Sequence, residues 1–260
     1  MSFFEKFFGY FRYADSEGVL GLPEPYKDGL GDGAFSDIRH ILWILVTILL
    51  AIGLYMLFSK NHKAGKYFVV IACGMLFATR LCNQIYRAAI GAEYPAWRAF
   101  PFHMCTVLSF LMPIVAIFKI DKIKTPVYTL AIMGGVITII IGDYFDNRFL
   151  TFATLEGMSA HTLLVLVPII EVAIGSWSIK FKNSWQTIVG IIILMFWATL
   201  ANKVFFADYD TNYMYLVRNA LPGNLGGDYF ILIYALIFFI LLFLINIVDI
   251  VRIIKGKIQK

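Results

Sequence analysis

Hydrophobic residues form seven long runs along the chain, separated by short connections that are richer in polar and charged residues. A helix that crosses the hydrocarbon core of a bilayer needs about 20 mostly apolar residues. We therefore expect membrane-spanning helices over 39–58, 67–90, 99–118, 125–142, 160–177, 185–204 and 229–251. The pattern predicts an all-α polytopic membrane protein whose seven transmembrane helices occupy residues 37–260.

Composition agrees with this prediction and excludes an ordinary soluble protein. Hydrophobic residues make up 60% of the chain and charged residues 15%, and the mean hydropathy is +0.77. Soluble domains contain far more charge and less apolar surface.

Basic residues occur in alternate connections, which predicts the orientation in the cell membrane. Loops rich in lysine and arginine stay in the cytoplasm. The basic connections and the tail contain Lys60, Lys63, Lys66, Lys119, Lys122, Lys124, Lys180, Lys182, Arg252, Lys255, Lys257 and Lys260. We therefore expect the N-terminus outside and the C-terminus in the cytoplasm. The net charge of +5 then reflects topology, and we expect no nucleic-acid partner.

Residues 1–36 are predicted to form a separate N-terminal segment. Five phenylalanines recur at helical spacing in its first part (Phe3, Phe4, Phe7, Phe8 and Phe11), which predicts a short amphipathic helix in the outer membrane interface. A loop rich in glycine and proline follows. The segment lacks the basic and apolar regions of a secretory signal.

The three cysteines, Cys73, Cys82 and Cys105, are too few and too scattered for a disulfide framework. Neither Cys-x-x-Cys nor His-Glu-x-x-His occurs, so we expect no metal site and no cofactor.

A polar stripe runs along the second predicted span, in the sequence "ATRLCNQIYRA". Arg80, Asn83, Gln84 and Arg87 are spaced so that they share one helix face. Two interpretations remain open. The stripe either makes hydrogen bonds that hold neighbouring helices together, or it lines a pocket in which an arginine binds an anionic headgroup.

The third span begins with "AFPFHMCTVLSF", which brings His103 and Cys105 close in sequence. On a helix these two side chains point about 200° apart. Cys105 then shares a face with Phe102, Ser109 and Met112, and a base for its thiol must come from another helix.

The fifth span supplies a candidate base in "EGMSAHTLLVLVP". With Ser159 as the N-cap, His161 lies at the outer end of this helix. An imidazole within reach makes a cysteine a nucleophile; the alternative is a buried thiol beside a hydrogen-bonded histidine. Asn202 or Asn83 can orient His161, as the third group of a catalytic triad does.

Other polar residues divide between the two ends of the spans. Asn212 and Tyr213, in the loop "DYDTNYMYL", lie at the outer level. Glu171 falls in the cytoplasmic half, where it either pairs with Lys180 or serves a separate role.

The motif "PFHMC" at 101–105, with His161 and "TNYMYL" at 211–216, resembles the YwaF family, which is related to transmembrane protein 164. The resemblance implies acyl transfer onto phospholipids through an acyl-cysteine intermediate. It makes Cys105 the nucleophile and His161 the general base, and leaves His103 without an assigned role.

On this hypothesis the partner is a membrane phospholipid or another acyl lipid. Asn83 or Arg80 stabilises the oxyanion. The candidate substrate-binding residues are Arg80, Asn83, Gln84, His103, Asn202, Asn212 and Tyr213.

Three other functions fit the same residues. A lipid hydrolase uses the same Cys/His pair with water as acceptor. A non-catalytic transporter or binder of a small polar or lipid ligand uses the Arg80 stripe and needs no nucleophile. A structural subunit of a larger membrane complex needs neither.

Overall fold

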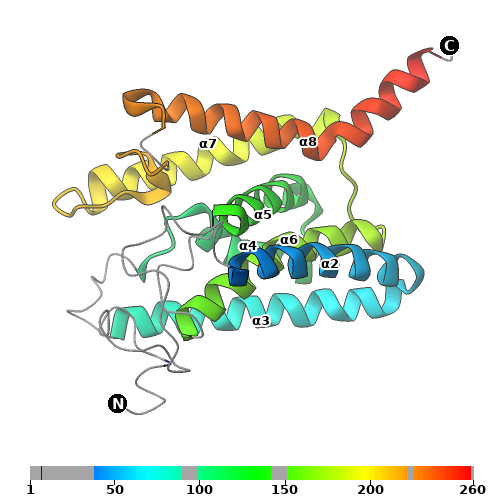
Figure 1. Ribbon diagram of the computed structural model, residues 1–260, viewed down its shortest axis with the longest axis horizontal. Coiled ribbons are helices and arrows are strands. Elements are labelled where there is room, and N and C mark those ends of the chain that lie inside the picture. The colour runs from blue at the N-terminus through cyan, green and yellow to red at the C-terminus, as the bar shows by residue number, and fades with distance from the viewer. Residues whose placement is uncertain (1–6, 8–37, 90–98, 142–150, 222–224, 259–260) are drawn as a thin grey trace.

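The computed structural model describes residues 7, 38–89, 99–141, 151–221 and 225–258 (Figure 1). Apart from Phe7, the predicted N-terminal segment 1–36 lies outside these residues. The described chain is helical and contains no strand. Its α-helices are α2 (Ile38–Lys60), α3 (His62–Ala89), α4 (Met104–Ile117), α5 (Asp121–Ile141), α6 (Phe152–Ala173), α7 (Ser184–Leu200) and α8 (Phe230–Ile258).

The described chain also contains short helical turns. A π-helical turn, η5 (Ala201–Phe205), extends α7. The 3₁₀ turns are η4 (Phe181–Asn183), η6 (Tyr213–Tyr215) and η8 (Gly227–Tyr229).

Six helices in the described part of the chain are long and apolar enough to cross a membrane, and α4 is the shorter seventh. With 14 residues, α4 is about 21 Å long, whereas the hydrocarbon core is about 30 Å thick. The predicted span 99–118 was too long at its start because residues 99–103 are not α-helical. Their backbone has partners in the protein, as irregular backbone at membrane depth requires: the Trp197 indole donates to the Pro101 carbonyl at 3.3 Å.

The start of α6 also differs from the prediction. The helix begins at Phe152, and the Thr151 side chain caps it by accepting from the Thr154 N–H. Ser159 is therefore not the N-cap; its hydroxyl donates to the Glu156 carbonyl inside the helix. His161 consequently lies in the third turn of α6 instead of at its end.

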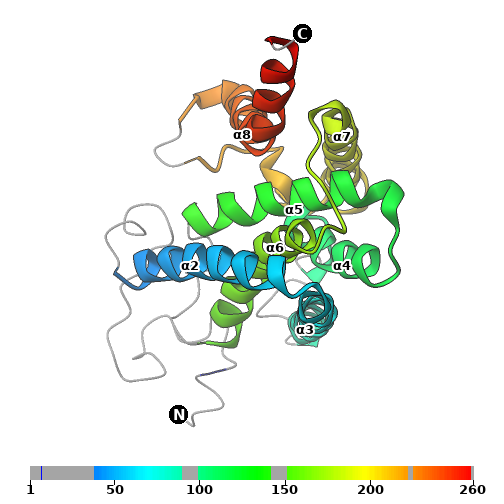
Figure 2. The ribbon, with the colours of Figure 1, turned by 90° about the vertical axis from the view of Figure 1, so that its right-hand side faces the viewer.

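Helix α5 lies between two groups of helices. Seen along the bundle, α7 and α8 lie on one side of it and α2, α3, α4 and α6 on the other (Figure 2). It contacts α4, α6, α7 and α8. Different faces of α5 therefore pack against different helices.

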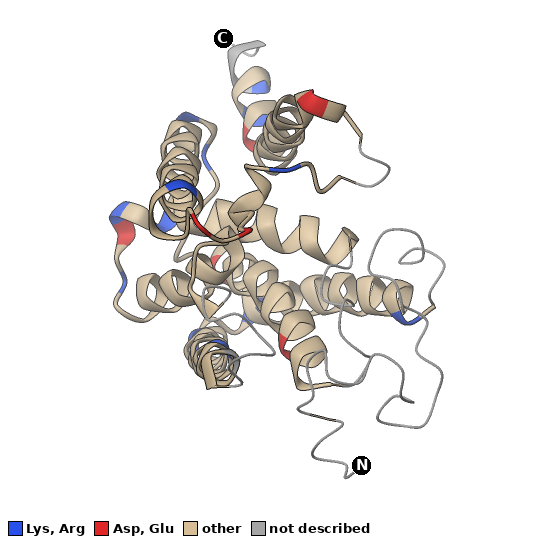
Figure 3. Cartoon of the chain, turned by 90° about the vertical axis from the view of Figure 1, so that its left-hand side faces the viewer, with Lys and Arg blue, Asp and Glu red and all other residues tan. Residues whose placement is uncertain are grey.

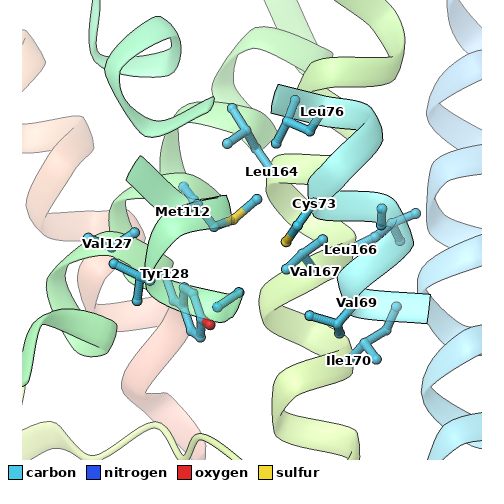
Figure 4. Close-up of a cluster of buried hydrophobic side chains, with 14 of the residues drawn as sticks. Val69, Cys73, Leu76, Met112, Val127, Tyr128, Leu164, Leu166, Val167 and Ile170 are labelled. Atoms are coloured by element: carbon cyan, nitrogen blue, oxygen red, sulfur yellow. The ribbon is translucent and has the colours of Figure 1, made fainter. Parts of the chain in front are cut away.

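Burial divides the helices into central and peripheral ones. In its most apolar stretch α6 has 72% of its residues buried, whereas α2 and α8 have 11%. Exposed apolar side chains on α2 and α8 are expected to face lipid. The hydrophobic core lies between α3, α4, α5 and α6, where Cys73, Met112, Tyr128, Leu164 and Ile170 meet (Figure 4).

Charged residues are sparse along the helices, and most of the ribbon in Figure 3 carries no charge. The α2–α3 turn, the α6–α7 connection and the C-terminus all lie at one end of the bundle (Figure 1). The predicted pairing of Glu171 with Lys180 was wrong. Glu171 instead pairs with Lys124 at 3.6 Å and accepts a hydrogen bond from Ser176.

Candidate functional site

Cys105 lies in the first turn of α4, directly after the PFH part of the motif. His103 is the N-cap, with the extended backbone angles φ −77° and ψ 141°, so Cys105 is the second helical residue. The expected angle of about 200° between His103 and Cys105 therefore does not apply, because His103 is not helical. First-turn N–H groups and the helix dipole favour negative charge at this position, which stabilises a thiolate.

The thiol of Cys105 faces α5. Its Sγ is 3.8 Å from the Thr138 hydroxyl, and a Cβ added to Gly134 would lie 3.0 Å from Sγ. Gly134 and Thr138 are one turn apart on α5, so the half-buried thiol packs on a single face of that helix. The glycine makes this close approach possible.

His161 is oriented by its own helix. Its Nδ1 lies 2.6 Å from the Gly157 carbonyl. A carbonyl oxygen only accepts hydrogen bonds, so Nδ1 carries a proton, and in the neutral form of the ring the lone pair is on Nε2. This is the nitrogen that would act as a base. The prediction that Asn202 orients His161 was wrong, because both polar atoms of the Asn202 amide bond to Tyr213.

Two adjacent glycines on α5 bring the helices of Cys105 and His161 to the same level. Gly134 contacts the Cys105 thiol, and a Cβ on Gly135 would lie 2.8 Å from the His161 carbonyl oxygen. Helices α4 and α6 also contact each other. Small residues allow this close packing within a membrane, and they bring the Cys105 thiol and the His161 backbone against neighbouring residues of α5.

The Arg80 stripe of α3 meets an acid that the sequence analysis missed. Arg80 Nε lies 3.1 Å from Glu156 Oε1, and the Asn83 amide donates to Glu156 Oε2 at 2.6 Å. Arg80, Asn83 and Glu156 are all buried. The stripe therefore joins α3 to α6, as the packing interpretation expects.

Glu156 was missed because the predicted span began at residue 160, which left Glu156 in a loop. One feature of the sequence did point to such an acid: Arg80 lies on a predicted membrane helix, where a buried arginine needs an acidic partner. Glu156 and His161 both lie on α6, so the stripe is attached to the helix that carries the candidate base. Gln84, on the same face, has a buried Oε1 without a hydrogen-bond partner among the described residues.

His103 contacts the TNYMYL motif. Its Nδ1 accepts a hydrogen bond from the Met214 N–H at 3.3 Å, and its ring lies 5.3 Å from that of Tyr213. Asn212 fixes the next stretch, since its Oδ1 accepts from the N–H groups of Val217 and Arg218. The two motifs of the sequence analysis thus meet at the start of α4.

A fully buried histidine that the sequence analysis passed over, His40, lies near the C-terminal end of α5. Nε2 of His40, on α2, donates to the Ile139 carbonyl at 2.7 Å. Ile139 is among the last residues of α5, whose carbonyls lack helical partners. His40 therefore ties α2 to the end of the helix that carries both glycines.

Residues 34–247 match the TMEM164 family. The chain belongs to the TMEM164 family. No curated protein and no solved structure matches the chain.

The family match covers most of the helical bundle, from the start of α2 into α8, and nearly all of the predicted segment 1–36 lies outside it. Together with the apolar helices, membership in this membrane family identifies a multi-pass membrane protein. The kinship to transmembrane protein 164 is confirmed, while the YwaF name stays a prediction.

Among the described residues no three His, Cys, Asp or Glu side chains are grouped so that they could hold a metal ion.

Proposed function

We propose that the protein is an integral membrane acyltransferase that moves a fatty acyl chain between membrane lipids, or onto a lipid-linked acceptor, with Cys105 as the acyl carrier. The observation that carries the proposal is that the Cys105 thiol packs against Gly134 while the backbone carbonyl of His161 packs against the adjacent Gly135. Membership in the TMEM164 family agrees with it. Cys105 lies in the first turn of α4, and the His161 ring is oriented by the hydrogen bond from its Nδ1 to the Gly157 carbonyl.

In the first step His161 Nε2 accepts the thiol proton, and Cys105 Sγ attacks the ester carbonyl of a donor lipid. The tetrahedral intermediate carries a negative charge on oxygen. N–H groups of the first turn of α4 lie beside the thiol and stabilise that charge; Asn83 and Arg80 are further candidates. The C–O bond then breaks, and the lyso-lipid leaves with the proton from His161.

In the second step His161 removes the proton of an acceptor hydroxyl, whose oxygen attacks the thioester. The Cys105 thiolate leaves and takes the proton back. Water in place of the acceptor would make the protein a hydrolase, so an apolar surrounding that excludes water separates the two activities.

We further propose that the site opens toward the extracytoplasmic side of the cell membrane, with the N-terminus outside and the C-terminus in the cytoplasm. The lysines Lys60 and Lys182 lie near one end of the bundle, and the positive end is cytoplasmic. Cys105, in the first turn of α4, is remote from Lys119, which follows the same helix.

Transfer of a labelled acyl chain between lipids in reconstituted vesicles tests the proposal. Cys105→Ser should lose most of the activity, because an unactivated hydroxyl is a far poorer nucleophile. His161→Ala should lose a comparable amount, and the double variant should be little worse than either, since the two groups act as a unit.

Cys82→Ser is the matched control, because Cys82 is exposed on α3, and it should keep full activity. Full activity in Cys105→Ser would contradict covalent catalysis and favour a non-catalytic binder or transporter. Additive losses would show that Cys105 and His161 do not work together.

A further inference from the structure

The turn η6 has a backbone conformation that residues other than glycine rarely adopt. Met214 has φ 54° and ψ 18°, and Tyr215 has φ 56°. In this left-handed region the Cβ of an L-residue crowds the following carbonyl. Such residues persist only where the surrounding structure holds them, so the contacts of this turn are informative.

Asn202 provides the first of these contacts, from the π-helical turn at the end of α7. It accepts a hydrogen bond from the Tyr213 N–H at 2.9 Å and donates to the Tyr213 carbonyl at 3.1 Å. The Tyr213 side chain is buried and packs on Phe102. One side of the turn is thus attached firmly to α7.

His103 provides the second contact, from the start of α4. Its Nδ1 accepts from the N–H of Met214, the first residue with positive φ. Its ring also lies 5.6 Å from the ring of Tyr215. His103 is the N-cap of the helix whose second residue is Cys105, so the same residue holds the turn and begins the thiol-bearing helix.

We propose that residues 214–216 form a lid over the amino-terminal end of α4, with Tyr213 as its fixed end, and that His103 is the latch that keeps this lid closed. His103 is then a positioning residue that acts through Met214. Opening the lid exposes the first turn of α4, where a lipid would reach Cys105. The role of this opening in admitting a lipid substrate rests on the proposed function. The opening itself can be measured as reactivity of the Cys105 thiol, whether or not the protein is an acyltransferase.

The closed lid has features that favour its release. The two positive φ angles relax when the turn leaves α4. The hydrogen bond from the Met214 N–H to His103 opposes this release, so its loss should have the largest effect on opening.

The rate at which a maleimide alkylates Cys105 measures opening, and mass spectrometry can follow each cysteine separately in the full-length protein. His103→Phe keeps an aromatic ring but loses the acceptor, and we expect about fivefold faster alkylation of Cys105. His103→Asn keeps an acceptor at the position of Nδ1 and should stay close to the wild-type rate. Met214→Gly removes the backbone strain and should slow alkylation about fivefold.

Two native cysteines serve as internal references in the same samples. Cys73 is buried in the core and Cys82 is exposed, so neither rate should change in these variants. An unchanged Cys105 rate in His103→Phe would contradict the latch. An equal rise at Cys73 would show general loosening and would also overturn it. Loss of acyl transfer in Cys105→Ser is a separate result, so a failed latch and a failed acyltransferase proposal are distinguishable.

Discussion

A buried ion pair, Arg80 with Glu156, joins α3 to the helix that carries His161. Both side chains are almost fully enclosed, at 6% and 1% exposure. Removing one member of such a pair leaves a buried charge without compensation, whereas replacing both with apolar groups is often tolerated. This asymmetry allows the packing role of Arg80 to be separated from a role in the site.

We predict that Arg80→Ala lowers the free energy of unfolding by about 3–5 kcal/mol, because Glu156 stays buried without its partner. The double variant Arg80→Met with Glu156→Leu should recover most of this loss. Thermal denaturation in detergent measures both, with Lys182→Ala on an exposed position as the control. A stable Arg80→Ala variant would contradict the buried pair.

Acyl transfer by the double variant then decides what the stripe does. If the double variant folds but transfers no acyl chains, Arg80 acts on the substrate or on His161. Normal turnover would leave the stripe as a connection between α3 and α6, and would remove Arg80 from the list of substrate-binding residues.

Among the elements, the long apolar helices followed directly from the sequence, because the length of a hydrophobic run determines whether a segment can span. The predicted span 185–204 corresponds to α7 together with η5, which ends at Phe205. Element ends were less predictable. At α4, Pro101 and an extended His103 stop the helix, and at α6 an earlier cap at Thr151 adds two turns.

The candidate site was predictable only in part, for a related reason. Cys105 and His161 stood out because polar groups inside apolar runs are rare. Their settings depend on tertiary contacts that have no local signal: Gly134 and Gly135 matter because α4 and α6 approach them. The burial of Glu156 was also not predictable from its local sequence, because its charge is compensated by Arg80, which lies on another helix.

The glycine pair leads to a prediction for α5. In Gly134→Ala the new Cβ would lie 2.8 Å from Met104 Cε and 3.0 Å from Cys105 Sγ, so the Met104 side chain and the Cys105 thiol must move. Misplacement by about 1 Å can cost about 100-fold in rate, and we expect acyl transfer to fall at least tenfold while the protein stays folded.

Gly53→Ala and Gly74→Ala are matched controls on α2 and α3, because nothing lies within 4 Å of a Cβ at either position. Alanine favours helix there, so these variants should be neutral or slightly more stable. Equal activity in Gly134→Ala and in the controls would show that the position of α4 against α5 is unimportant for function.

For the molecule as a whole, the position of basic residues at one end of the bundle predicts its orientation. Cysteines introduced at Lys63 or Lys182 should resist an impermeant thiol reagent in intact cells, whereas one introduced at Asp210 should react. All three positions are exposed, so accessibility within the protein does not bias the comparison. The native cysteines are replaced first, and permeabilised cells provide the control.

Labelling at Lys182 from outside would reverse the orientation and place the proposed site on the cytoplasmic side. The internal geometry of Cys105, His161 and α5 would be unaffected by that result.

The central claim is that the acyl chain is carried on the Cys105 thiol. Mass spectrometry of the purified protein after incubation with a donor lipid of known chain length measures this directly. We expect a mass increase of one acyl group on the peptide that contains Cys105, removed by neutral hydroxylamine as a thioester is, and absent in Cys105→Ser. Acyl transfer that continues in Cys105→Ser, or an adduct confined to Cys73 or Cys82, would contradict the account.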